Sequence, residues 1–161
     1  MRWVRQGNFT LIARINQIGP RCRCSKAKLR DAVVVVDDAE AGEHEAVADI
    51  LAGLGHHKNA ASSYLLAAKA YDTSGDQGKM LQMNRAAAEA YRAEAVKWVA
   101  RGDYQEAATN YYEAAKAYDS ISQHRSAFFT FRKAHSCYLV CRNYAMASEV
   151  EKAIEQYQIL P

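Results

Sequence analysis

The sequence predicts an all-α fold in which six helices form three antiparallel pairs. Two observations support this prediction. Between residues 88 and 121, small and aromatic residues recur at intervals of three, four and seven, the period of a helix that buries one side. The same pattern returns elsewhere in the chain, at shifts of 47 and 40 residues. Because one helix pair cannot bury its apolar face alone, about three stacked pairs are needed for stability.

Residues 1–41 differ in composition from the rest of the chain, and we predict a basic arm and an acidic linker or cap there, followed by a helical repeat domain over residues 42–161. Residues 1–30 hold eight basic side chains and no acid, whereas residues 31–49 hold seven acids and no Lys or Arg. The arm resembles a mitochondrial presequence in its Arg content, but it is poor in Ser. A poorly packed leader and a short helix that caps the repeats are the alternatives.

The segment from Lys26 to Ala41 contains four consecutive valines, which favour a strand. An isolated strand would have nothing to pair with in a stack of helices. We therefore expect a helix here, with Leu29, Val33 and Val36 facing inward.

The first helix pair is predicted near residues 43–54 and 58–73. A shift of 47 residues places the phrase Ala-Ala-Lys-Ala-Tyr-Asp at 67–72 over the identical phrase at 114–119. The same shift matches Ala48, Leu51, Gly55, Ala60 and Tyr64 with Ala95, Trp98, Gly102, Ala107 and Tyr111.

The second pair is predicted near residues 77–101 and 104–119. Its inward face is formed by Tyr91, Ala95, Trp98, Ala107, Tyr111, Ala114 and Tyr118. Gly102 is suited to the left-handed conformation that ends a helix, and the Asp103 side chain to accepting from the free N–H groups of the next helix.

The third pair is predicted near residues 123–141 and 144–157. A shift of 40 residues matches Phe131, Tyr138 and Ala147 with Tyr91, Trp98 and Ala107. It also puts Glu151 where Tyr111 stands, so we expect the last helix to be out of register by one residue, with Val150 and Ala153 inward.

This pattern resembles the tetratricopeptide repeat (TPR), a helix-turn-helix of 34 residues. Tyr91, Ala95 and Trp98 match the first helix of that family, and Ala107, Tyr111 and Ala114 match the second. Glu94 stands where the family usually has Leu, and Asp119 replaces its closing Pro. The resemblance implies a right-handed α-solenoid of three TPR-like pairs.

The long, uneven repeats over residues 43–157 also resemble the soluble NSF attachment proteins (SNAP) of vesicle fusion. The phrases at 60–71 and 110–118, both rich in Ala and Tyr, are the basis of this resemblance. It implies a role in membrane trafficking, which is one variant of the alternative function given at the end of this section.

No motif in the sequence predicts an enzyme or a bound cofactor. Gly75 to Lys79 lacks the spacing and the Ser or Thr of a phosphate loop, and we expect an inter-helix turn there. His44-Glu45 lacks the second histidine of a zinc-protease helix, because Ala48 occupies its place.

Metal binding is not expected either. Cys22 and Cys24 would make a half-site for a soft metal only if His56 and His57 completed it. Cys137 and Cys141 share a helix face and are expected to be buried as small apolar residues.

The four cysteines do not suggest a disulfide scaffold, and neither a secretory signal nor an apolar run of the ~20 residues that span a bilayer is visible. We therefore expect a cytoplasmic protein without a transmembrane segment. The net charge of +3 does not by itself indicate nucleic acid as a partner.

The resemblance assigns ligand binding to the concave side, which is lined by the first helix of each pair. The function predicted is a non-catalytic adaptor or scaffold that binds a peptide segment or a helix of a partner protein in this groove. The residues expected to face it are Glu45, Asp49, Glu89, Arg92, Val96, Phe129, Arg132, Lys133 and Ser136.

Two further hypotheses concern other surfaces of the chain. The alternative function is binding of nucleic acid or an anionic membrane through the basic arm, residues 1–30. A homodimer that shares Phe128, Phe129 and Phe131 between two copies is the other hypothesis.

Overall fold

A computed structural model describes the backbone of residues 26–158 and the side chains of residues 39–157. All regular secondary structure in this part of the chain is helical, which confirms the predicted all-α class. The helices are α2 (Lys26–Gly53), α3 (His57–Ser74), α4 (Gln77–Arg101), α5 (Tyr104–Ser120), α6 (His124–Val140) and α7 (Tyr144–Gln158). The described residues from 34 onward belong to one compact unit.

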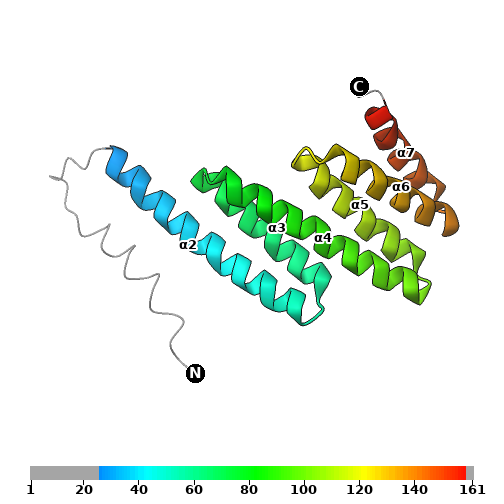
Figure 1. Cartoon of the computed structure of the whole chain (residues 1–161), viewed down its shortest axis with the longest axis horizontal. Helices are drawn as coiled ribbons and strands as arrows, with labels where there is room; N and C mark the ends of the chain where they lie inside the picture. The colour runs from blue at the N-terminus through cyan, green and yellow to red at the C-terminus, as the bar shows by residue number, and fades with distance from the viewer. Residues whose placement is uncertain (1–25, 159–161) are drawn as a thin grey trace. The chain divides into compact units, whose positions relative to one another are not determined.

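Each helix of this unit packs against its neighbour in the sequence. From α3 to α7, every helix contacts the next, and consecutive helices run in alternating directions (Figure 1). Hydrogen bonds join α2 to α3, because the hydroxyls of Tyr64 and Tyr71 donate to Asp49 and Glu45. The helix directions alternate because the connections are short: a turn of two or three residues returns the chain beside the helix that it has just left.

The buried residues are mainly alanines and tyrosines, and they form two clusters along the chain. One cluster lies chiefly among α2, α3 and α4, and the other joins α4, α5, α6 and α7. Alanine at a contact lets two helices approach closely, and tyrosine fills the space beside it. The apolar core is therefore made of successive contacts between helices.

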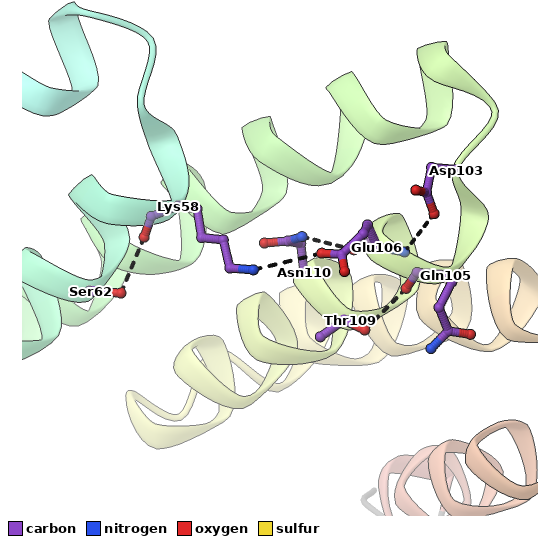
Figure 2. Close-up of polar contacts among 7 residues, drawn as sticks. All are labelled: Lys58, Ser62, Asp103, Gln105, Glu106, Thr109 and Asn110. Atoms are coloured by element: carbon purple, nitrogen blue, oxygen red, sulfur yellow. Dashed lines mark hydrogen bonds and ion pairs between the residues drawn. The ribbon is translucent and has the colours of Figure 1, made fainter.

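The turns between helices follow the predicted chemistry. Gly75 and Gly102 adopt left-handed conformations, with φ of 85° and 80°. Asp76 and Asp103 accept hydrogen bonds from the backbone N–H groups of Lys79 and Glu106, and Figure 2 shows the second of these caps. The predicted roles of Gly102 and Asp103 are thus confirmed, as is the inter-helix turn at Gly75.

The last two turns keep this geometry without glycine. Ser122 and Arg142 take the left-handed conformation, with φ of 57° and 60°. After the second of these turns, the Asn143 side chain accepts from the N–H of Met146 at 3.3 Å, as Asp103 does for α5.

The predicted helix boundaries are close to the observed ones except at the start of α2. From α3 to α7, each boundary lies within one residue of its prediction. The expected helix near 43–54 instead begins at Lys26, which confirms that residues 26–41 are helical. Gly42 does not interrupt it, since an interior glycine costs only about 1 kcal/mol. The side chains of Leu29, Val33 and Val36 lie outside the described residues. The predicted domain boundary between residues 41 and 42 stays a prediction.

The predicted inward faces are largely confirmed. Ala95, Tyr111 and Tyr118 are buried, and Trp98 is partly buried against the same cluster. In α7, Val150 is fully buried and Ala153 is partly buried, as the one-residue change of register requires. The expectation for the cysteine pair holds in part. Cys137 is buried, but Cys141 lies beyond the end of α6 and is only partly buried.

Replacing Gly102 with alanine should lower the free energy of unfolding by about 1–2 kcal/mol, the cost of a left-handed non-glycine residue. The added methyl group would meet no atom within 4 Å, so the effect is conformational and not steric. Urea unfolding followed by circular dichroism measures it.

The matched control is Gly42→Ala in the interior of α2, where the methyl group also meets nothing within 4 Å. This change should stabilise the protein by about 0.5–1 kcal/mol, because alanine favours a helix over glycine. Equal effects of the two substitutions would contradict the assigned turn.

Candidate functional site

Four of the nine residues predicted to face a groove line one hollow on the surface. These are Phe129, Arg132, Lys133 and Ser136, all on α6. Val99 of α4, Tyr111 of α5 and Cys137 of α6 complete the lining, and the volume is about 460 Å³. We call this feature the Tyr111 hollow.

The hollow arises from the way in which α6 divides its residues between two faces. Phe131, Ala134 and Tyr138 are buried between α6 and its neighbours. Arg132, Lys133 and Ser136 project from the other side of the helix and are exposed. Tyr111 is only 5% exposed, so it contributes a largely covered wall, whereas Phe129 is 50% exposed.

The electrostatic character of the Tyr111 hollow is cationic. The Lys133 ammonium lies 5.7 Å from the centroid of the Tyr111 ring, and the Arg132 guanidinium lies 5.8 Å from that of Phe128. Burial raises the pKa of Tyr111, and the nearby positive charge of Arg92 opposes this shift. The described residues that line the hollow include no acid. An anionic or apolar group of a ligand would therefore find complementary side chains here.

None of the three predicted residues of α4 lines the hollow. Arg92 is exposed and acts electrostatically on both Tyr111 and Tyr118. Val96 is 54% exposed. Glu89 forms an ion pair with Arg85 at 3.5 Å, one turn earlier on the same helix.

The two predicted residues of α2 are engaged in the contact between α2 and α3. The Tyr71 hydroxyl donates to Glu45 at 2.7 Å, and the Tyr64 hydroxyl donates to Asp49 at 2.5 Å. Neither carboxylate lines the Tyr111 hollow. Sequence spacing placed both residues on an outer face of a helix, but it could not show that tyrosines 15 and 26 residues later would reach them.

Sequence reasoning did not assign Val99, Tyr111 and Cys137 to a binding surface. Tyr111 was expected in the core, and it does pack there, but one side of it also borders the hollow. No local spacing in the sequence assigns these three residues to the hollow, because it forms only where α4, α5 and α6 meet.

Two other hollows carry mixed charges. One, of about 390 Å³, lies at the turn between α2 and α3 and includes Lys58, Glu94, Lys97 and Arg101. Lys97 donates to the Gly55 carbonyl and pairs with Glu94, which stands where the repeat family has Leu. The other, of about 500 Å³, lies between α6 and α7 and includes Arg132 beside Glu151 and Glu155.

The described residues contain no cluster of three or more His, Cys, Asp or Glu placed to hold a metal ion. Cys22 and Cys24, for which a metal half-site was considered, lie outside the described residues, as do residues 1–25 of the basic arm. Among the helices that the structure describes, none is long and apolar enough to cross a bilayer.

Comparison of the chain with protein-family models, curated proteins and solved structures gave no match. The resemblances to the tetratricopeptide repeat and to the soluble attachment proteins therefore stay hypotheses. The function proposed below rests on the geometry of the described residues.

The partly buried contact between Tyr64 and Asp49 predicts a loss of stability at alkaline pH. Burial raises the pKa of Tyr64 to about 12, and the hydrogen bond to Asp49 adds to the effect. The unfolded chain releases this proton near pH 10, so unfolding becomes easier as the pH rises from about 10 to 12. The decrease attributable to Tyr64 should approach about 1.4 kcal/mol per pH unit in this window.

Urea unfolding at a series of pH values checks this prediction. Tyr64→Phe removes the titrating group and should show a smaller decrease between pH 10 and 12 than the unsubstituted protein. Other tyrosines with raised pKa values, Tyr118 and Tyr138 among them, should supply the remaining decrease. Identical pH profiles for the two proteins would contradict the role assigned to Tyr64.

Proposed function

We propose that this protein is a non-catalytic adaptor that binds a segment of a partner protein at the Tyr111 hollow. The observation that supports this most directly is the half-exposed Phe129 beside Arg132 and Lys133, over a wall formed by Tyr111 and Val99. An apolar anchor surrounded by cations suits a peptide segment or a helix with an apolar side chain and nearby carboxylates.

The proposal includes a right-handed α-solenoid of three TPR-like pairs, α2–α3, α4–α5 and α6–α7. Contacts between helices two apart in the sequence support it, because stacked pairs bring such helices together. Lys58 of α3 pairs with Glu106 of α5 at 3.7 Å, as Figure 2 shows. Tyr112 of α5 donates to Glu149 of α7 at 3.2 Å. In such an array the Tyr111 hollow lies where first helices of successive pairs adjoin.

The open shape of the hollow, and not its volume, favours a protein segment over a small metabolite, whose site would enclose most of the ligand. A space of about 460 Å³ that opens to solvent receives a few side chains and leaves the backbone of a ligand outside. Burial of Phe129 by the ligand would add roughly half of the 1.5–3 kcal/mol that full burial of such a side chain contributes. Each exposed ion pair would add about 0.2–1 kcal/mol.

Charge reversal at the hollow tests the proposal. The triple variant Arg92→Glu, Arg132→Glu and Lys133→Glu should lose the partner proteins that the unsubstituted chain retains in affinity purification from its native cell. Quantitative mass spectrometry of the retained proteins measures the loss, and a partner list unchanged by the triple variant would exclude the hollow as the binding site.

The control variant changes net charge equally but leaves the hollow intact. Lys69→Glu, Arg125→Glu and Lys152→Glu alter exposed residues that do not line it. This variant should retain the partners, and equal loss in both variants would point to overall charge instead of the site. Phe129→Ser alone should weaken binding by about tenfold, the effect of 1.4 kcal/mol.

A further inference from the structure

One face of α2 carries a row of exposed apolar side chains away from its contact with α3. Val47 is 49% exposed, Ile50 is 63% exposed and Leu54, just beyond the helix end, is 68% exposed. Their spacing of three and four residues places them along one side of the helix. The other side is occupied, because Ala41 and Ala48 are fully buried and Glu45 and Asp49 accept hydrogen bonds from α3.

The same spacing continues toward the N-terminal end of the helix into two glutamates. Glu43 precedes Val47 by four residues, and Glu40 precedes Glu43 by three. Both glutamates are exposed, and the Glu40 carboxylate lies 3.9 Å from the His44 ring nitrogen. We call the five residues the α2 seam: Glu40, Glu43, Val47, Ile50 and Leu54.

The seam has the seven-residue repeat of a surface that pairs with another helix. Alternating intervals of three and four residues keep a row of side chains facing one partner along the whole length of contact. The row runs over 14 residue steps from Glu40 to Leu54, about 21 Å at 1.5 Å per step, which is roughly four helical turns. An isolated exposed apolar side chain needs no explanation, but three in one such row form an apolar strip of the kind that a partner helix can cover.

Charge decides which kind of helix the seam accepts. No Lys or Arg occurs on α2 between residues 31 and 49, so the charged side chains that the helix itself places in the N-terminal half of the row are the carboxylates of Glu40 and Glu43, with His44 beside Glu40. A partner helix that approaches must bring positive side chains opposite Glu40 and Glu43. It must also bring apolar side chains opposite Val47, Ile50 and Leu54.

A second copy of the chain fits the seam poorly. Parallel pairing would place each glutamate against its equivalent, and like charges at facing positions repel. Antiparallel pairing centred on Val47 would put Glu43 near Ile50 and Glu40 near Leu54, which would remove carboxylates from water without a partner charge. In these two registers, self-pairing loses the complementarity that a basic helix supplies.

We propose that the α2 seam binds an amphipathic basic helix of a partner protein, with Lys or Arg opposite Glu40 and Glu43 and apolar residues opposite Val47, Ile50 and Leu54. This site is separate from the Tyr111 hollow, which uses α4, α5 and α6 and has the opposite charge. The inference does not depend on the proposed function of that hollow.

The test uses the full chain and two synthetic helical peptides of three heptads. Both carry Leu at the seam positions that face Val47, Ile50 and Leu54. The basic peptide has Lys opposite Glu40 and Glu43, and the acidic peptide has Glu there. Fluorescence anisotropy of the labelled peptides measures affinity. The unsubstituted protein should bind the basic peptide at least about tenfold more tightly than the acidic one.

Exchange of charge makes the test specific for the seam. The double variant Glu40→Lys and Glu43→Lys should reverse the preference between the two peptides. The control double variant Glu151→Lys and Glu155→Lys on α7 should leave it unchanged. Ile50→Ser should weaken the binding of both peptides. Circular dichroism should show that each protein variant keeps its helical content.

Several outcomes would overturn the inference. The inference is wrong if the basic peptide does not bind, if both peptides bind equally, or if the Glu40 and Glu43 variant keeps the original preference. Sedimentation equilibrium tests one further possibility. If the chain dimerises and Ile50→Ser dissociates the dimer, the seam binds a second copy and the proposed basic partner is wrong.

Discussion

Close contact between alanine-rich helix faces is the constraint on which the rest of this structure depends. Ala95, Ala107 and Ala134 have no exposed surface, and tyrosines beside them fill the space between neighbouring helices. A larger side chain at any of these alanines would separate two helices, because a packed contact has no spare volume. Each helix therefore depends on its neighbours for burial. Its remaining face is left for solvent or a partner.

Tyrosine serves this arrangement better than phenylalanine would, because its hydroxyl reaches polar groups at the edge of each contact. Tyr64, Tyr71 and Tyr112 donate to carboxylates on helices other than their own. The rings of Tyr64 and Tyr71 are buried while their oxygens find an acceptor, so a large apolar area is covered and these hydroxyls are satisfied. The bonds from Tyr64 and Tyr71 also hold Asp49 and Glu45 of α2 against α3.

The surfaces left over differ in charge along the chain. The free face of α2 combines apolar residues with Glu40 and Glu43, whereas the Tyr111 hollow combines Phe129 with Arg132 and Lys133. Each surface pairs an apolar anchor with charge of one sign, an arrangement that selects partners by complementarity and excludes those of like charge. If both proposals hold, the chain binds two partners of opposite charge.

The sequence by itself determined where α3 to α7 begin and end and which face each one buries. These features are local: apolar spacing, Gly102 in its turn and Asp103 at its cap act within a few residues. Only the tertiary structure decided which exposed residues meet. Four predicted residues of α6 converge with Tyr111, but Glu45 and Asp49 are held by tyrosines of α3. Periodicity fixes the face of a helix on which a residue lies, whereas the rotation and approach of the neighbouring helix fix what that face contacts.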